Sequence, residues 1–127
     1  MKTRVQSGSP YESTYGFCRA VRTGNRIDVA GTAPIPPKRE RVAEDAHAQM
    51  LRCGEIIAAA IEELGGSMRD VVRTRMFITD AADADEVGRA HGELFSDSPP
   101  VATMVVVHAL LDPAWKVEVE AEAIIEP

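Results

Sequence analysis

The chain has 127 residues, of which 45% are hydrophobic and 27% charged, with a formal net charge of −6. This composition is typical of one globular domain with a single core, and the acidic balance argues against nucleic acid as the main partner, because phosphate binding needs a basic surface. No apolar run approaches the roughly 18 residues that cross a membrane, and the polar start, MKTRVQSGSPYE, lacks the apolar core of a secretory signal. We therefore expect a cytoplasmic protein, not bound to a membrane, with reduced cysteines.

The N-terminal third of the sequence predicts a hairpin. Residues 1–15 lack periodicity and are expected to form a loosely ordered arm of a single domain spanning 1–127. Residues 17–22 and 26–30 read as short strands, and the turn chemistry of Thr23-Gly24-Asn25 joins them. The proline-rich loop that follows, GTAPIPPKRER, is excluded from the interior of a sheet.

Residues 42–64 change to the period of a helix. Apolar residues recur there at spacings of three and four: Ala46, Met50, Cys53, Ile57, Ile61 and Leu64. Gly65-Gly66 is typical of a helix end, where a left-handed residue is favoured. Ser67 and Asp70 have the spacing of a capping box and predict one further helical turn.

The C-terminal half predicts three strands and a second helix. Residues 71–79 are rich in β-branched residues and predict a strand, after which Asp80 or Asp83 caps the helix. The apolar stripe of that helix is Ala84, Val87, His91, Leu94 and Phe95. Residues 101–109 and 115–125 predict the last two strands, the second with near-strict alternation. The order β-β-α-β-α-β-β indicates an α+β fold, with two helices covering one face of a five-stranded sheet.

The strand at 101–109 is apolar on both faces. Val101, Thr103, Val105 and Val107 alternate with Ala102, Met104 and Val106, and both faces favour burial. Because the helices supply only one cover, the second is expected from another copy of the chain. The alternative is that the N-terminal arm or the proline-rich loop folds over it.

Several segments, in order, resemble the YjgF/RidA family, also called L-PSP. They are Gly16-Phe17, GNRIDVAGTAP, LGGSMRDVVRTRMFITD, EVGRAHGELF, PPVATMVVV and WKVEVEAEA, and the likeness covers roughly residues 16–125. The resemblance implies the chorismate-mutase-like α+β fold, a homotrimer with an inner barrel, and small-molecule clefts between subunits. Known members hydrolyse enamines and imines to 2-keto acids and ammonia, as 2-iminobutanoate/2-iminopropanoate deaminases. Others are described as ribonucleases or translation inhibitors, or bind ligands without an agreed reaction.

The resemblance also points to a departure from the deaminase site. Deaminating members carry an arginine in a Pro-x-Arg-Ser pattern, and a guanidinium suits a substrate carboxylate because it donates two parallel hydrogen bonds. The matching stretch here is Pro100-Val101-Ala102-Thr103, so Ala102 stands where the arginine would be. By the same comparison Phe17 replaces a tyrosine, Ala30 replaces a serine before Gly31, and Gly88 replaces an asparagine.

The glutamate of the last strand is retained as Glu118. In the family it is thought to orient or activate a water molecule, a role open to a carboxylate of raised pKa. The alternative is a solvated row, because Glu120 and Glu122 share its strand face.

Two other side chains are candidates for the cleft. Arg19 lies two residues from Phe17, on the same strand face, and is hypothesised to bind an anionic group of the ligand; the alternative is an exposed strand arginine. His91 is either a satisfied, half-buried side chain or a cleft donor or general base.

Three functions remain open. The first is an enamine or imine deaminase, or a related hydrolase, of altered substrate, with Glu118 as its catalytic candidate. The second is a non-catalytic binding or regulatory trimer. The third, an L-PSP-type endoribonuclease, is disfavoured by the acidic charge. The expected substrate-binding residues are Phe17, Arg19, Ala30, Gly31, Gly88, His91, Ala102 and Thr103. No cofactor and no metal site are expected, since the histidines and cysteines lack ligand spacing.

Overall fold

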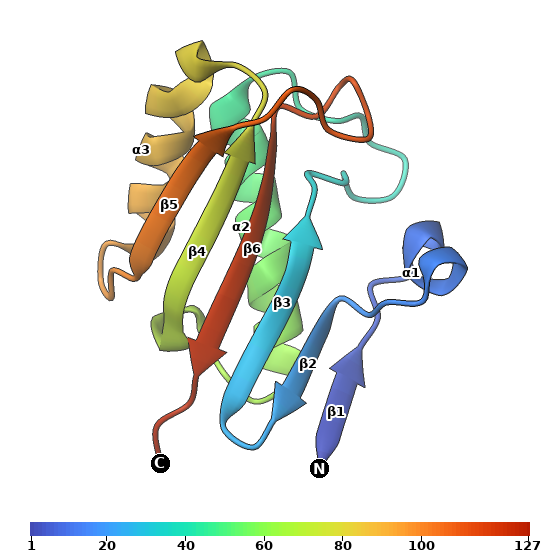
Figure 1. Cartoon of the computed structure of the whole chain (residues 1–127), viewed down its shortest axis with the longest axis vertical. Helices are drawn as coiled ribbons and strands as arrows, with labels where there is room; N and C mark the ends of the chain where they lie inside the picture. The colour runs from blue at the N-terminus through green and yellow to red at the C-terminus, as the bar shows by residue number, and fades with distance from the viewer.

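A six-stranded sheet, covered on one face by two long helices, forms the frame of the computed structural model, which describes residues 1–127 (Figure 1). The sheet order is β1-β2-β3-β6-β4-β5, and every neighbouring pair is antiparallel except β4 and β5. The strands are β1 (Lys2–Val5), β2 (Ala20–Thr23), β3 (Arg26–Thr32), β4 (Val71–Ile78), β5 (Val101–Val106) and β6 (Val117–Ile124). The helices are α1 (Pro10–Tyr15), α2 (Ala46–Glu63) and α3 (Ala84–Phe95), with single 3-10 turns at Met68–Asp70 and Ala81–Asp83. The α+β class is confirmed.

The N-terminal segment corrects the sequence prediction. The expectation of a loosely ordered arm and of only five strands is wrong, because β1 pairs with β2 as a sixth, edge strand. Helix α1 follows, capped by the Ser9 side chain, which accepts a hydrogen bond from the Tyr11 amide, and ended by Gly16 at φ 75°. Both elements are too short to show periodicity. Only Val5 of β1 is buried, so no alternation marks that strand.

The hairpin and the long helix follow the local sequence signals, with shifted boundaries. Gly24, at φ 63°, forms the turn between β2 and β3, but β2 begins at Ala20, so Phe17 and Cys18 precede it. Helix α2 begins at Ala46, since the Asp45 side chain caps it by accepting from the Ala48 amide.

Helix α2 ends as its glycines predict. Gly65 has φ 92°, and the Gly66 amide donates to the Ile61 carbonyl at 2.9 Å, which is the bond that closes a left-handed helix end. The capping box of Ser67 and Asp70 also forms. At the second helix, Asp80 accepts from the Ala82 amide and starts the 3-10 turn, whereas Asp83 makes no side-chain cap.

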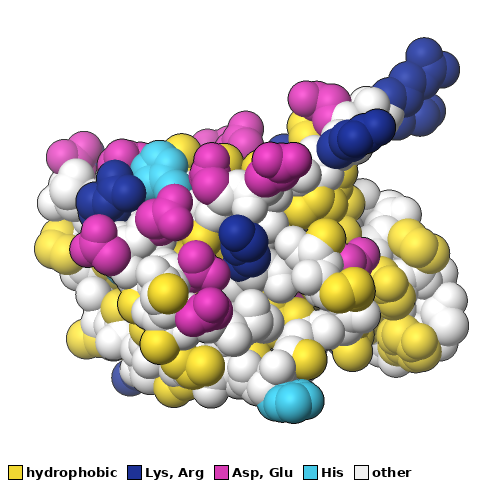
Figure 2. All heavy atoms as spheres, turned by 90° about the horizontal axis from the view of Figure 1, so that it is seen from above, with side chains coloured by type: hydrophobic (Ala, Val, Ile, Leu, Met, Phe, Trp, Pro, Cys, Tyr) yellow, Lys and Arg dark blue, Asp and Glu magenta, His cyan; other side chains and the backbone are white.

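The core lies between the sheet and helices α2 and α3. Strand β6 runs through its centre, and its odd-numbered residues Val117, Val119, Ala121 and Ala123 are buried as the alternation predicts. The opposite face of the sheet carries the charged row of β6. No helix is long and apolar enough to cross a membrane. Viewed from above, Asp and Glu side chains gather along one edge, and Lys and Arg side chains project at one corner (Figure 2).

Strand β5 lies at the edge of the sheet opposite β1. Val101, Val105 and Val106 are 58%, 42% and 56% exposed in the single chain. The N-terminal segment pairs at the other edge, and the valines remain open, so neither the arm nor the proline-rich loop covers them. The expectation that a second copy covers β5 stays a prediction.

Candidate functional site

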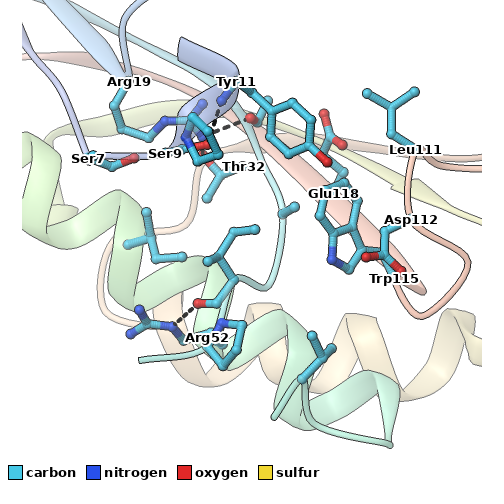
Figure 3. Close-up of a pocket in the computed structure, with 18 of the residues that line it drawn as sticks. Ser7, Ser9, Tyr11, Arg19, Thr32, Arg52, Leu111, Asp112, Trp115 and Glu118 are labelled. Atoms are coloured by element: carbon cyan, nitrogen blue, oxygen red, sulfur yellow. Dashed lines mark hydrogen bonds between the residues drawn. The ribbon is translucent and has the colours of Figure 1, made fainter. Parts of the chain in front are cut away.

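A pocket of about 670 Å³ lies where the N-terminal segment meets the end of β3 and the start of β6 (Figure 3). Helix α2 contributes Arg52 and Ile56, and the segment before β6 contributes Leu111, Asp112 and Trp115. Its size lies within the few hundred to about 1,000 Å³ usual for small-molecule sites, and such sites combine apolar walls with a few convergent polar groups. Both kinds of group are present here.

Arg19 forms the polar floor of this pocket. Its side chain is almost fully buried, and its Nη1 donates to the Gly31 carbonyl at 2.8 Å and to Thr32 Oγ1 at 3.0 Å. The pairing of β3 with β6 shifts register between Val29 and Thr32. This irregularity frees the Gly31 carbonyl from the β-ladder, and Arg19 satisfies it. The Arg19 guanidinium also lies 5.6 Å from the centre of the Phe17 ring, within cation–π range.

A buried carboxylate balances the charge of Arg19. Glu12, on α1, is 2% exposed, and its Oε2 lies 3.4 Å from Arg19 Nε. Nε itself makes no hydrogen bond, so the contact is an ion pair without hydrogen-bond geometry. Glu12 also accepts from the Ser7 amide at 2.8 Å and from the Ser7 hydroxyl. The pair therefore fixes the N-terminal segment against the sheet.

Glu118 differs from the other glutamates of its row. Glu120 pairs with Arg75 at 3.5 Å, and Glu122 pairs with Arg73 at 3.4 Å. Glu118 faces the pocket and makes no ion pair. Burial raises the pKa of its carboxyl, an effect that the positive charge of Arg19 partly opposes. The alternative interpretation, a solvated row, therefore does not describe Glu118, which lines the pocket.

Gly31 makes room for the Glu118 carboxyl. A Cβ added at Gly31 would overlap Glu118 Oε2, so any larger residue would displace the carboxyl group. A glycine is therefore needed at position 31 because the Glu118 side chain occupies the space that a Cβ would fill.

The walls of the pocket are aromatic and aliphatic. Tyr11 and Tyr15 stack on α1 with ring centres 6.0 Å apart. Figure 3 shows Tyr11 turned toward the side of the pocket that Glu118 and Trp115 form. The remaining apolar walls are Phe17, Ala33, Ile35, Pro36, Pro37, Val42, Ile56 and Leu111.

Four of the sequence-predicted site residues meet here: Phe17, Arg19, Gly31 and Glu118 all line the pocket. The alternative interpretation of Arg19 as an exposed strand arginine is wrong, because it is buried and precedes β2. Ala30 lines a neighbouring, shallower hollow of about 580 Å³ together with Phe17.

The other four lie elsewhere in the single chain. Gly88 and His91 are on α3, and Ala102 and Thr103 are on β5, near the opposite edge of the sheet. None of them lines the pocket. His91 is half-buried, its Nε2 lies 2.8 Å from Thr74 Oγ1, and burial lowers its pKa. Within this chain, His91 is therefore a half-buried side chain whose hydrogen bonding is satisfied by Thr74, the first of the two interpretations given for it.

Sequence reasoning missed the N-terminal contribution, namely Tyr11, Tyr15 and Glu12, and also Thr32 and Trp115. One signal was available. Ser9 followed by Pro10 and Glu12 is the pattern of a helix start, with a capping serine, proline at the first position and an acid in the first turn. No local signal indicates that the resulting helix pairs with Arg19 and lines the pocket.

Comparison with known proteins gives the family. The family model described as Endoribonuclease L-PSP matches residues 8–125. The chain belongs to this family. An uncharacterized protein of Streptomyces coelicolor, SCO2049, is 42% identical over 120 residues, which cover 94% of this chain and 90% of that protein. The 2-iminobutanoate/2-iminopropanoate deaminase of Salmonella typhimurium is 31% identical over 111 residues, 85% of this chain and 86% of the enzyme.

Among solved structures, Rv2704 of Mycobacterium tuberculosis, described as a member of the YjgF/YER057c/UK114 family, superposes with a TM-score of 0.91 at 39% identity. The match covers 98% of this chain and 100% of that chain. The family and fold that the sequence segments resemble are thereby confirmed. Membership of the L-PSP family does not by itself identify the ligand, because proteins of one fold differ in the residues of their binding sites.

Proposed function

We propose that this L-PSP-family chain hydrolyses the C=N bond of an imine, or of the enamine that tautomerises to it, with Glu118 as general acid and base. The observation that carries the proposal is the unpaired, part-buried Glu118 carboxyl on the pocket wall, whose pKa is raised by burial. The kinship with the Salmonella deaminase, at 31% identity, supports the same reaction class.

The chemistry uses the two protonation states of one carboxyl group. In the acid form Glu118 donates a proton to the imine nitrogen, which makes the carbon electrophilic. In the carboxylate form it accepts a proton from the attacking water. One water is consumed, the C=N bond becomes C=O, and ammonia leaves. Because burial raises the pKa of Glu118, the pH limb that depends on its carboxylate form is expected above the ordinary carboxyl value of 4.5.

The substrate is proposed to lack a carboxylate held in the family's usual way. Ala102 offers no charge at the position that the resemblance aligns with the arginine. Arg19 is the cation that the sequence offers in place of the arginine, but it already binds Gly31, Thr32 and Glu12. These contacts favour an altered substrate over 2-aminoacrylate.

The test is ammonia release from 2-aminoacrylate generated in the assay and from imines without a carboxylate. We expect the parent chain to accelerate the second class, and Glu118→Gln to reduce that acceleration by about 100-fold, the usual range for a general acid–base group. Glu120→Gln is the matched control, because Glu120 shares the strand face but pairs with Arg75. An equal loss in both variants contradicts the role of Glu118.

A non-catalytic binding trimer is the second candidate function, and it is favoured by the commitment of Arg19 to protein partners. The Ala102→Arg variant separates the two. Deamination of 2-aminoacrylate gained only in that variant, with no imine hydrolysed by the parent, would establish the binding role.

A further inference from the structure

The N-terminal segment Ser7–Phe17 supplies an aromatic wall to the pocket. Tyr11 and Tyr15 stack with an interplanar angle of 17°, and Phe17 follows directly after α1. These rings are partly exposed, at 39%, 68% and 37%, although Tyr11 and Phe17 belong to a segment that is fixed by the buried Glu12. Trp115 lines the same pocket from the side of β6. The rings are exposed, but the buried Glu12 holds their segment in place. This arrangement favours contact between the rings and a ligand in the pocket.

The polar groups of the pocket do not suit an anion. Arg19 is neutralised by Glu12, and Arg52 donates its Nε to the Ile35 carbonyl at 2.6 Å and lies 3.9 Å from Glu55. Glu118 and Asp112 add negative charge on the opposite side. A carboxylate entering here meets two acids, while Arg19 and Arg52 are already engaged. Lys38, an exposed residue of the proline-rich loop, also lines the pocket and makes no ion pair. The charges of the lining and of its ion-pair partners therefore come close to balance, which favours a neutral ligand.

The size of the pocket favours a ligand larger than the small imines that the family's deaminases hydrolyse. A volume of about 670 Å³ greatly exceeds what a three-carbon imine fills. Planar aromatic groups gain from offset stacking or edge contacts with other rings. The pocket carries such rings beside the carboxyl group.

We propose that the substrates are imines that carry an aromatic ring and no carboxylate, and that Tyr11 and Tyr15 select the ring. This inference rests on the proposed function for its chemistry, but not for the ring contact. The ring lies along the wall of the N-terminal segment, and the C=N group points to Glu118. The balanced reaction is R–CH=NH + H₂O → R–CHO + NH₃, with the ring in R.

The first experiment measures binding without catalysis. Trp115 is the only tryptophan, so its fluorescence reports directly on the pocket. Three probes are titrated into the purified protein: phenylacetamide, propanamide without the ring, and phenylacetate with a charge. We expect phenylacetamide to bind about tenfold more tightly than either of the others. In Tyr11→Ala/Tyr15→Ala the preference over propanamide is lost, whereas in Glu118→Gln it is retained.

Circular dichroism and the solution mass of each variant accompany the titration. Equal affinity for phenylacetamide and propanamide in the parent overturns the inference. A changed solution mass in the tyrosine variant, with the ring preference intact, also overturns it, because the rings then serve contact between copies.

The second experiment separates this inference from the proposed function. Imines are generated in the assay from 2-phenylethylamine and from propylamine by an amine oxidase that releases the free imine, and hydrolysis is followed as the initial rate of ammonia release. Acceleration of both imines to the same degree, abolished in Glu118→Gln, keeps the hydrolase and overturns the ring selection. Tight phenylacetamide binding with no acceleration of either imine overturns the hydrolase and keeps the aromatic wall.

Discussion

Glu118 and Glu120 show how surroundings decide the chemistry of identical side chains. Both point to the same face of β6, two residues apart. Glu120 has Arg75 for a partner, so its charge is compensated. Glu118 instead lies beside Gly31, in the pocket that Trp115 also lines, and burial there disfavours ionisation of its carboxyl. A carboxyl of raised pKa is the form of glutamate that proton transfer near neutral pH requires.

The position of this carboxyl depends on Gly31. In Gly31→Ala the new methyl group would overlap Glu118 Oε2, and the flexible side chain would swing away rather than unfold the strand. We expect imine hydrolysis to fall by at least about tenfold, since small displacements of a proton donor are costly, with an unchanged circular dichroism spectrum. Gly92→Ala, on α3, is the control, because nothing lies within 4 Å of its added Cβ. Full activity in Gly31→Ala would show that the observed position of Glu118 is not the one used.

At the scale of elements, the N-terminal segment is held by one buried ion pair. Strand β1 has four residues and α1 has six, and neither length is stable alone. Glu12 links them, because it binds Ser7 between the two elements and Arg19 directly before β2. The aromatic wall of Tyr11 and Tyr15 therefore depends on the ion pair between Glu12 and Arg19, in which neither tyrosine takes part.

Removing the carboxylate should release this segment. In Glu12→Ala the buried Arg19 charge loses its partner, and we expect the free energy of unfolding to fall by about 3 kcal/mol. Urea unfolding followed by circular dichroism measures the change, and limited proteolysis should cut within residues 1–17. Glu62→Ala, at an exposed position of α2, should change stability by less than about 0.5 kcal/mol. Equal stability of the two variants would mean that the segment docks without the ion pair.

At the scale of the whole molecule, β5 is an edge strand whose apolar side chains are not covered by the rest of the chain. It pairs with β4 alone, and its valines are open to solvent although they belong to an apolar strand. Gly88, Ala102 and Thr103, which the resemblance assigns to the cleft, also lie on this side of the molecule. Association through β5 would bring them to another copy, which is the arrangement that the resemblance predicts.

A charge on β5 should prevent that association. We expect the parent chain to have a solution mass near three times its 13.7 kDa, and Val105→Glu to shift it toward the single-chain value, because an unpaired carboxylate cannot be buried in an apolar contact. Light scattering coupled to size exclusion measures both. Ala59→Glu places the same charge on the exposed face of α2 and should leave the mass unchanged. A parent that runs as a single chain would contradict the predicted trimer.

The sequence by itself determined the features that depend on neighbours along the chain. The turn at Gly24, the glycine end of α2, the capping box at Ser67 and the alternation of β6 are set by backbone conformation and side-chain period within a few residues. The ordered segments were likewise enough to identify the family. The resemblance also placed Phe17, Gly31 and Glu118 among the residues that line one pocket.

Only the tertiary structure decided what surrounds those residues. The burial of Arg19, its pairing with Glu12 and the separation of Glu118 from its ion-paired row come from contacts across three strands and a helix. Elements as short as β1 and α1 have too few side chains to show a hydrophobic periodicity from which their packing could be predicted. A short helix packs where the folded surface accepts it, and that surface exists only once the sheet is assembled.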